Sequence, residues 1–255
     1  DYHRVLKAKL YALAKEVKKI IGYELHVRPC VDTAPLLEHE AAALAGVGFI
    51  AKSTLTLIPG LGTYVLLGEL LIDLELPPSE PIEPRCGECK ACLDACPTNA
   101  FISANILDAR RCIAYLTIEF RGVIPEEFRS MIGNRIFGCD DCQFICPWNK
   151  FAKASNELKF LPMNRIDDLY LSKLSMLDDK KFREFFSRSP IKRIGRDRFV
   201  RNVMIAIGNS KSKKLVKYAL KNLYDESPLV RGASVWAIKE ILDGKELQKI
   251  KNRSL

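Results

Sequence analysis

Two cysteine-rich runs organise this chain: Cys86-Gly-Glu-Cys89-Lys-Ala-Cys92-Leu-Asp-Ala-Cys96-Pro97 and Cys139-Asp-Asp-Cys142-Gln-Phe-Ile-Cys146-Pro147. The first run has the spacing C-x2-C-x2-C-x3-C-P. In bacterial ferredoxins, three cysteines of this pattern bind one [4Fe–4S] cluster and the fourth binds a second cluster. The two runs therefore predict an iron–sulfur protein with two [4Fe–4S] clusters.

The crossing of the fourth cysteine predicts which thiols share a cluster. The first cluster takes three cysteines of the first run and the last one of the second: Cys86, Cys89, Cys92 and Cys146. The second run lacks a third cysteine, and a lone cysteine between the runs fills its place. The second cluster then has these ligands: Cys96, Cys112, Cys139 and Cys142. Of the nine cysteines in the chain, Cys30 alone is left over.

Zinc and disulfides are the alternatives for paired CxxC motifs. Zinc would use only four of the eight thiols, and the x2, x2, x3 spacing before Cys-Pro is much more specific than a bare CxxC pair. Disulfides belong to oxidising compartments, whereas clusters need reduced thiols. The cluster prediction therefore implies a reducing, cytoplasmic environment.

The composition sets outer bounds on the fold. With 255 residues, of which 48% are hydrophobic, the chain can build one large core or two ordinary ones. It has no run of about eighteen apolar residues, so we expect no membrane span. No signal-peptide pattern stands at the start. The chain begins with Asp1 rather than Met and leads directly into a helical pattern, so we expect that an amino-terminal portion is missing.

The net charge of +9 is unevenly distributed. Residues 1–150 contain 16 Lys and Arg against 19 Asp and Glu, whereas residues 151–255 contain 24 against 12. The basic part is therefore the last hundred residues or so. An acidic cluster-binding part followed by a basic carboxy-terminal part favours binding to a polyanionic partner.

The amino-terminal region reads as helix, strand and helix. Residues 2–21 have apolar side chains at helical spacing and end before Gly22. Residues 24–31 alternate polar and apolar side chains as a strand does. Pro35 is suited to the first turn of a second helix. Asp32 lies between that strand and helix, where α/β proteins often place working side chains. The alternative is that Asp32 or its neighbour Thr33 only caps the helix.

The following segments carry weaker patterns. Residues 46–58 form a loop rich in small and hydroxyl side chains, and they match neither a Walker A loop nor GxGxxG. Residues 64–73 are apolar enough for a buried strand, and residues 76–85 contain four prolines and read as a linker. Leu107 to Phe120 has helical periodicity and carries Cys112. A further helix is expected to start at Pro125.

The carboxy-terminal part contains a basic helical repeat. Residues 199–207 match residues 229–237 at a spacing of 30, and further apolar helices accompany both. This pattern predicts a short HEAT-like array, although a charge run is more often simply a solvated face. The candidates for phosphate contact precede or begin the first repeat: Arg188, Lys192, Arg193, Arg196, Arg198 and Arg201.

Seven segments of the chain together match the pattern of one known family: Asp1-Tyr-His-Arg-Val-Leu, Val31-Asp-Thr-Ala-Pro-Leu-Leu-Glu38, Ala45-Gly-Val-Gly-Phe-Ile-Ala-Lys52, Cys86 to Thr98, Arg111 to Glu119, Ile132-Gly-Asn-Arg135, and Gly138 to Trp148. On these segments, and over nearly its whole length, the chain resembles the epoxyqueuosine reductase family. One departure is Ala51, which precedes Lys52 where the family commonly has glycine.

The resemblance implies an enzyme that reduces epoxyqueuosine at the tRNA wobble position, with cobalamin and two [4Fe–4S] clusters as cofactors. It aligns Asp32 with the family's proton donor, a role that requires a raised pKa. It also implies base-off cobalamin, since no Asp-x-His-x-x-Gly motif is present. The candidates for cofactor binding are Asp32, Lys52, Ser53, Thr54, Thr56, Leu67, Tyr115, Thr117, Arg121 and Asp141.

The resulting prediction is an α+β protein with three domains. They are a partial cobalamin-binding α/β domain over residues 1–80, a ferredoxin-like two-cluster domain over 81–155, and a HEAT-like, tRNA-facing repeat over 156–255. The expected partners are a queuosine-type tRNA anticodon stem-loop and an external electron donor, with no membrane, and the chain is expected to be a monomer. The alternatives are a reductive-dehalogenase-like corrinoid enzyme and a plain ferredoxin-like electron carrier.

Overall fold

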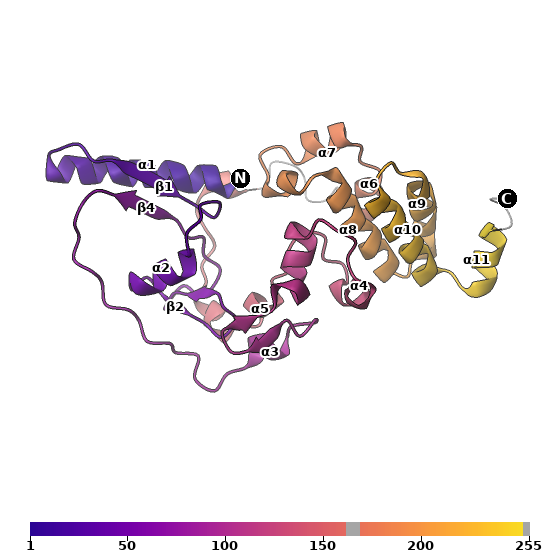
Figure 1. Ribbon diagram of the computed structural model, residues 1–255, viewed down its shortest axis with the longest axis horizontal. Helices are drawn as coiled ribbons and strands as arrows, with labels where there is room; N and C mark the ends of the chain where they lie inside the picture. Colours follow the sequence, from indigo (N-terminus) through magenta and orange to yellow (C-terminus); the bar gives the residue numbers. More distant parts are fainter. Residues whose placement is uncertain (162–168, 252–255) are drawn as a thin grey trace. The chain divides into compact units, whose positions relative to one another are not determined.

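The computed structural model of the chain describes residues 1–161 and 169–251. It has the mixed helical and stranded composition that the sequence predicts, and it divides into two compact units (Figure 1). Unit 1 consists of Asp1–Leu107 and Asp140–Leu161, and unit 2 of Asp108–Cys139 and Pro162–Leu255. These units have different bounds from the three domains expected above, which stay a prediction.

Unit 1 begins with the predicted amphipathic helix, α1 (Tyr2–Ile21). Its amino terminus is capped by Asp1, whose carboxylate accepts a hydrogen bond from the His3 N–H, and its carboxyl terminus is closed by Gly22 in the left-handed conformation (φ 76°). The prediction for this segment is confirmed. Capping at both ends fixes the position of the first turn, which carries Tyr2 and His3.

The strands of unit 1 form short antiparallel pairs. β1 (Val27–Cys30) pairs with β4 (Glu69–Ile72), with Cys30 opposite Glu69. The expected buried strand over residues 64–73 is thus shorter, and Leu71 within it is 44% exposed. The other pairs are β2 (Phe49–Ile50) with β3 (Thr56–Leu57), and β5 (Phe101–Ser103) with β6 (Ile106–Leu107).

The remaining elements of unit 1 are short and flank these strands and the cysteine runs. They are α2 (Glu38–Leu44), α3 (Ala91–Asp94), α5 (Asp141–Phe144) and the 3-10 helices η3 (Pro147–Phe151) and η4 (Leu158–Phe160). The helix expected from Pro35 begins only at Glu38, and its start has no side-chain cap. Asp32 and Thr33 are therefore not caps of α2.

The regular elements of unit 2 within its described residues are all helices. Its first part contains η1 (Ala109–Arg111), η2 (Tyr115–Glu119) and α4 (Glu126–Ile132). Its second part contains α6 (Leu171–Leu174), α7 (Asp179–Phe185), η6 (Pro190–Ile194), α8 (Arg196–Asn209), η7 (Lys213–Leu215), α9 (Val216–Lys221), η8 (Asn222–Tyr224), α10 (Pro228–Ile241) and α11 (Gly244–Lys251). No helix within residues 1–161 and 169–251 combines the length and the apolar character that crossing a membrane requires.

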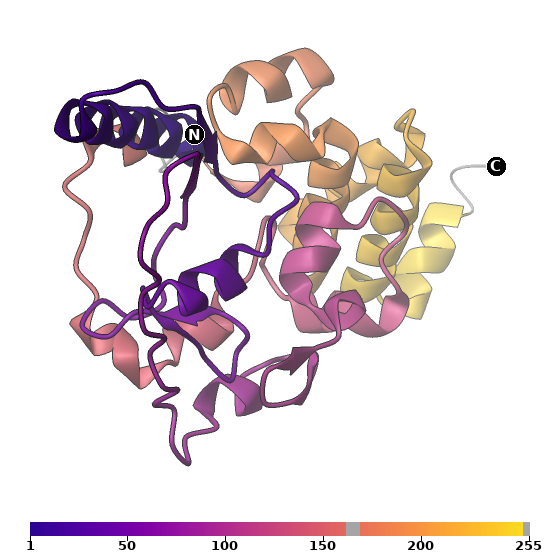
Figure 2. The same ribbon diagram turned by 60° about the vertical axis from the view of Figure 1, so that its left-hand side comes forward.

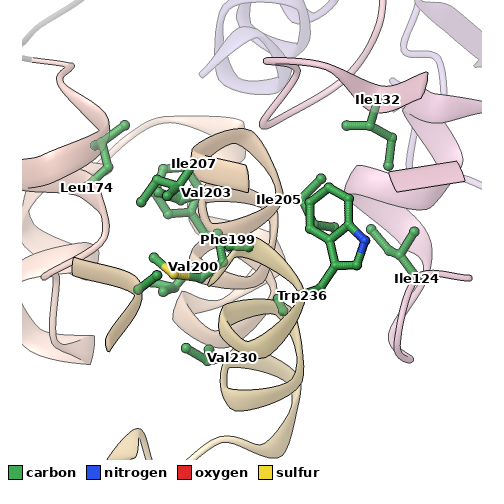
Figure 3. Packing of buried hydrophobic residues seen from close by; sticks show 14 of the residues in the cluster. Ile124, Ile132, Leu174, Phe199, Val200, Val203, Ile205, Ile207, Val230 and Trp236 are labelled. Atoms are coloured by element: carbon green, nitrogen blue, oxygen red, sulfur yellow. The ribbon is translucent and has the colours of Figure 1, made fainter. Parts of the chain in front are cut away.

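The core of unit 2 forms between α8 and α10, which contain the two copies of the sequence repeat and lie side by side (Figure 2). Trp236 of α10 belongs to the same apolar cluster as Phe199 and Ile205 of α8 (Figure 3). A Cβ added at Gly208 would lie 2.5 Å from the Trp236 ring, so glycine is needed where these helices approach. Helices at both repeat positions are confirmed. The HEAT-like character of the array stays a prediction.

The segment from Leu107 to Phe120 is not the continuous α-helix that its periodicity predicts. It consists of the 3-10 turn η1, an extended Cys112 (φ −70°, ψ 125°) and the π-helix η2. Within η2 the buried Thr117 hydroxyl donates to the Ile113 carbonyl at 2.7 Å and accepts the Gly138 N–H at 3.0 Å. Such local hydrogen bonds compete with regular helix geometry, and π-helical turns occur frequently at functional sites.

Candidate functional site

Four cysteine thiols from the two motifs are grouped in unit 1. Burial raises the pKa of the Cys92 thiol, and the negative charges of Cys86 and Cys146 raise it further. Burial likewise raises the pKa of Cys146, with additional contributions from Cys86 and Cys89. The last cysteine of the second motif therefore lies within electrostatic range of the first three of the first motif. Among the described residues, no group of three or more His, Cys, Asp or Glu side chains is placed to hold a metal ion, so the ligand set that the crossing rule gives stays a prediction.

An apolar cluster lies against this thiol group. Phe49, Ala51 and Leu57 are each at most 3% exposed, and Cys86 and Cys146 pack against them. Trp148, just after the second motif, meets Phe49 edge to face at 6.3 Å between ring centroids. The β2–β3 hairpin thus covers one side of these thiols with apolar side chains. Electrostatic interactions are stronger in such an apolar environment than in water.

Lys52 holds the first cysteine loop from the β2–β3 hairpin. Its ammonium donates to the Gly87 carbonyl at 2.5 Å and to the Cys89 carbonyl at 3.1 Å. The sequence predicted Lys52 as a corrin contact, and the structure shows in addition that it binds the backbone of the cluster loop. A positive charge at this place would favour the reduced, more negative state of a cluster.

The hairpin that carries Lys52 is itself fixed by Asn105, which the sequence analysis missed. The Asn105 side-chain amide donates to the Ala51 carbonyl at 2.8 Å and to the Ile50 carbonyl at 3.3 Å, and its backbone N–H donates to the Lys52 carbonyl. Asn105 has a positive φ of 64° in the turn between β5 and β6. The signal in the sequence that could have indicated this turn is an asparagine between two short apolar runs, because asparagine tolerates the left-handed conformation.

A second asparagine fixes the end of the second cysteine motif. The Asn149 Oδ1 accepts the Thr63 N–H at 2.7 Å, and its amide donates to the Gln143 carbonyl at 2.6 Å. A Cβ on Gly62 would lie 2.1 Å from Asn149 Oδ1, so glycine is required there. The Pro59–Gly62 turn therefore helps to hold the α5 region in place.

The ligands predicted for the second cluster come from both units. Cys96 and Cys142 belong to unit 1, whereas Cys112 and Cys139 belong to unit 2. The Cys96 sulfur accepts a hydrogen bond from the Ala100 N–H at 3.3 Å, which is the kind of contact that tunes a cluster ligand. This ligand set stays a prediction.

A cavity of about 900 Å³ lies beside the first thiol group within unit 1. Its wall includes Lys52 and Thr54, two of the predicted cofactor contacts, and also Cys86. Phe49 and Leu44 supply apolar surface. Neither Asp32 nor Leu67 is among its described lining residues.

Asp32 lies in the bend between β1 and α2 in a left-handed backbone conformation (φ 54°). Its Oδ2 accepts a hydrogen bond from the Tyr2 hydroxyl at 3.0 Å and lies 3.1 Å from His3 Nε2. His3 Nδ1 in turn lies 2.8 Å from Asp1 Oδ1. The Asp32 side chain is 46% exposed, so within unit 1 it is open to an incoming group. A non-glycine residue at positive φ costs roughly 1–3 kcal/mol and is frequent at functional sites.

The other predicted cofactor contacts differ in accessibility. The Thr56 hydroxyl is buried and lies 2.7 Å from His39 Nδ1. Ser53 and Thr117 are also buried. Tyr115 and Leu67 are half-buried, Asp141 begins α5, and Arg121 is exposed. Their contacts with a cofactor stay a prediction.

Three of the six predicted phosphate contacts have structural roles within unit 2. Arg201 is 1% exposed and donates to the carbonyls of Leu116, Phe120 and Gly122, so the prediction of a phosphate contact is corrected here. Burial lowers the pKa of Arg201 to about 10. Its side chain therefore joins α8 to the η2 region, through one carbonyl within the π-helix and two just after it.

Arg196 and Arg198 are also engaged within unit 2. Arg196 forms a two-point ion pair with Asp225, at 2.8 and 2.5 Å, and only 15% of its side chain is exposed. Arg198 donates to the Ile194 carbonyl at 2.6 Å and to the Ile118 carbonyl at 3.0 Å. These contacts show that a run of arginines in sequence need not form one accessible face. The exposed candidates are Arg188, Lys192 and Arg193.

The motif spacing and the thiol group place the chain in the class of ferredoxin-type iron–sulfur proteins. In agreement, residues 85–149 match the family model described as a 4Fe-4S double cluster binding domain. The chain is 44% identical to the epoxyqueuosine reductase of Xanthomonas campestris, over 94% of this chain and 68% of that protein. It is 43% identical to the Salmonella typhimurium epoxyqueuosine reductase, over 95% of this chain and 63% of that protein.

Solved structures agree with the sequence comparison. The fold is similar to that of an epoxyqueuosine reductase crystallised with an epoxyqueuosine-modified tRNA-Tyr stem loop, with a TM-score of 0.91 and 34% identity. That match covers 99% of this chain and 67% of the other. The chain belongs to the epoxyqueuosine reductase family. It spans about two thirds of the length of the relatives it matches.

Proposed function

We propose that this chain is the greater part of an oxidoreductase that reduces epoxyqueuosine to queuosine in tRNA. The observation that carries the proposal is the structural similarity, over 99% of the chain, to an epoxyqueuosine reductase bound to an epoxyqueuosine-modified stem loop. The grouped thiols and the accessible Asp32 support it, because the reaction needs both electrons and protons.

The reaction fixes what the residues must supply. Conversion of an epoxide to an alkene consumes two electrons and two protons, and the oxygen leaves as water. Asp32 is the proposed proton donor to that oxygen, and Tyr2 and His3 orient its carboxyl through the contacts at 3.0 and 3.1 Å. A carboxyl becomes an efficient acid when burial raises its pKa. Because Asp32 is 46% exposed here, that burial would come from bound cofactor and substrate.

The electron path is proposed from the cofactor-binding residues. Cys86, Cys89, Cys92 and Cys146 would hold one cluster, and Lys52 would favour its reduction. Cobalamin, when bound, would supply a strongly reducing cobalt centre that passes electrons to carbon. Lys52 and Thr54 are proposed to bind this cofactor, since they line a cavity that includes Cys86. An external donor would supply the electrons one at a time.

The exposed cations of unit 2 are the proposed tRNA contacts. Because phosphate binding releases counterions, the affinity for the anticodon stem-loop should fall steeply as salt rises. We expect the double variant Lys192→Gln/Arg193→Gln to weaken binding and to reduce the slope of log affinity against log salt by about 1–2. Titration of the labelled stem-loop at several salt concentrations measures this slope.

Lys15→Gln on α1 is the matched control, since Lys15 is an exposed lysine of the other unit. It should leave the slope unchanged. The double variant also removes the exposed Arg193–Glu119 ion pair, which is worth at most about 1 kcal/mol of stability. An unchanged slope in the double variant would exclude these two cations as phosphate contacts.

The activity is tested directly with the chain and with a version extended to the full family length. Each is reconstituted anaerobically with iron, sulfide and cobalamin, reduced, and mixed with epoxyqueuosine-containing tRNA, and the nucleosides are analysed by mass spectrometry. We expect conversion to queuosine by the extended version. If the extended protein holds both cofactors and leaves the epoxide unchanged, the proposal is wrong.

An absorption spectrum of the reconstituted protein distinguishes the proposed reductase from a ferredoxin-like carrier, and tRNA binding distinguishes it from a dehalogenase-like enzyme. A ferredoxin-like carrier would show iron–sulfur absorbance without cobalamin bands, whereas the proposed reductase shows both after reconstitution. A reductive-dehalogenase-like enzyme would also show both, but it would have no salt-sensitive affinity for tRNA.

A cytoplasmic location and a monomeric state complete the proposal.

A further inference from the structure

A single buried hydroxyl joins the two segments of unit 2 that carry cysteines. Thr117 is fully buried in η2, and its Oγ1 donates to the carbonyl of Ile113, the residue after Cys112, at 2.7 Å. The same oxygen accepts the N–H of Gly138, the residue before Cys139, at 3.0 Å. A hydroxyl can donate one hydrogen bond and accept others at the same time. Thr117 therefore connects the backbone next to one cysteine with the backbone next to the other.

A side chain of α8 connects the same two segments a second time. Asn202 is fully buried, and its amide nitrogen donates to the carbonyls of Thr117 and Ile136, each at 2.8 Å. Its amide oxygen accepts the Nε–H of Arg201 at 3.0 Å. Both N–H groups and the oxygen of the amide thus have partners, which fixes the orientation of the side chain. Asn202 adds a second bridge, between η2 and the residues just before Cys139.

Directional contacts matter here because the segment before Cys139 lies outside the helices and strands. It runs from the end of α4 at Ile132 to the start of α5 at Asp141, and Gly138 within it has a positive φ of 83°. Ile136 packs against the apolar core of unit 2. Apolar packing is not directional, whereas a hydrogen bond restricts both distance and angle. The two bridges therefore determine where the backbone before Cys139 lies relative to η2.

We propose that Thr117 and Asn202 are positioning residues that hold two ligands of the predicted second cluster in place. These ligands are Cys112 and Cys139, both of them half-buried thiols, the donor type that [4Fe–4S] clusters take. The inference rests on the proposed function, whose electron path uses such clusters. Ligands that the fold already holds in place retain a metal centre longer, because binding then has to order less of the chain.

The hydroxyl is tested by a pair of variants at Thr117. Thr117→Val keeps the shape of the side chain and removes the hydroxyl, whereas Thr117→Ser keeps the hydroxyl and removes a methyl group. The full chain is reconstituted anaerobically with iron and sulfide, and the loss of iron to a chelator is followed by absorbance. In the valine variant about four of roughly eight irons should leave about tenfold faster, the effect of losing one buried hydrogen bond. The other irons, and all irons of the serine variant, should leave at the unmodified rate.

Ser234→Ala on α10 is the matched control for the loss of a buried hydroxyl. Ser234 is fully buried in the same unit, and its Oγ donates to the Val230 carbonyl at 2.8 Å. This hydrogen bond lies within one helix and joins no cysteine segment to another. The variant should therefore release iron as the unmodified protein does.

The second bridge is tested by Asn202→Ala, which should also accelerate the loss of about four irons by about tenfold or more. Its control is Asn222→Ala. Asn222 is a buried asparagine of the same unit that donates to the carbonyls of Ser175 and Tyr218, at 3.1 and 2.9 Å. The control should leave both rates unchanged. If Thr117→Val does not fold, Asn202→Ala and Thr117→Ser keep the test decisive, since the serine variant must match the unmodified protein.

Hydrogen exchange shows whether these changes act through the backbone. In the cluster-loaded protein, the amide protection of residues 134–139 should fall about tenfold in Thr117→Val and in Asn202→Ala. It should stay unchanged in Thr117→Ser. A role in packing alone predicts the opposite order, because valine retains the packing of Thr117 and serine does not.

Several results would overturn the inference. It is wrong if the valine variant releases iron at the unmodified rate, if all of its irons leave equally faster, or if the serine variant behaves as the valine variant does. It is also wrong if the unmodified protein binds only about four irons, because no second cluster then exists to be positioned.

Iron release requires no tRNA, so this inference and the proposed activity fail separately. If the expected rates are found while the extended protein with both cofactors leaves epoxyqueuosine unchanged, the positioning residues stand and the proposed reaction is wrong. If the extended protein reduces epoxyqueuosine and its Thr117→Val variant releases iron at the unmodified rate, the reaction stands and the positioning role is excluded.

Discussion

Replacement of Asp32 by asparagine should lower the rate of epoxide reduction by about 10²–10⁴-fold, the range that a general acid contributes. Asparagine retains the shape of the side chain and an oxygen that can accept from Tyr2, but its amide is not an acid. The backbone N–H that Glu38 binds is unchanged, and asparagine tolerates the left-handed conformation of this position. The variant thus removes the proton and little else.

The measurement is a single-turnover assay with prereduced, cofactor-loaded protein, so that product release does not mask the chemical step. Iron content and the cobalamin spectrum should equal those of the unmodified protein. A loss of either would mean that the substitution disturbs cofactor binding rather than proton transfer. Asp73→Asn is the matched control, since Asp73 is a carboxylate of the same unit that binds His26.

Full activity in Asp32→Asn would exclude Asp32 as the proton donor. The simplest alternative role, a cap of α2, is already contradicted because α2 begins six residues later without a side-chain cap. The role left for Asp32 would then be structural, in a bend whose backbone N–H donates to Glu38. Reduced activity in both Asp32→Asn and Asp73→Asn would point instead to general destabilisation of unit 1.

Local patterns in the sequence predicted the parts of the fold that depend on local physics. Gly22 ends α1, and Pro125 precedes α4. The spacing of the cysteine runs indicated which thiols would be neighbours, because a motif that binds a cluster fixes its own geometry. The repeat copies correctly predicted α8 and α10.

Contacts between distant segments could not be predicted in this way. Arg201 and Lys192 look alike in a basic run, but Arg201 is buried and donates to carbonyls in and just after the π-helix η2, whereas Lys192 is exposed. The helical periodicity around Thr117 was genuine, yet the side-chain hydrogen bond to Ile113 favours a wider turn. Periodicity reports which face is buried, not how many residues make up a turn.

The surroundings of Asp32 show the same limit. The sequence predicted the residue and its place after a strand, but the described strands pair antiparallel and not in the parallel sheet that is typical of α/β domains. Its partners Tyr2 and Glu38 come from two helices, 30 positions before it and six positions after it along the chain. These residues meet through tertiary packing, which neither the composition nor the spacing of residues in the sequence predicts.

Loss of one complete cluster is expected when Cys112 is replaced by alanine. The second motif has only three cysteines, and its last one is grouped with the first motif, so the second cluster depends on Cys112 for its full set of thiolates. Iron and acid-labile sulfide should each fall from about eight to about four atoms per chain. Chemical analysis of anaerobically reconstituted protein measures both.

Cys30→Ala is the matched control for this experiment. Cys30 is 3% exposed in β1, where its sulfur lies 3.8 Å from the Arg28 carbonyl. Its replacement should cost about 1 kcal/mol of stability, as the loss of a small buried group does, and no iron. Cys146→Ala should lose the first cluster and gives the value expected for one cluster removed.

The combination of variants distinguishes the possible ligand sets. If Cys112→Ala retains about eight irons while Cys146→Ala loses four, another group completes the second cluster, and Asp140 and Asp141 of the second motif become the candidates. If both variants lose all iron, the clusters assemble cooperatively, and spectra of partly loaded protein must separate them. Loss of four irons in each, with none lost in Cys30→Ala, would identify Cys112 and Cys146 as cluster ligands and exclude Cys30.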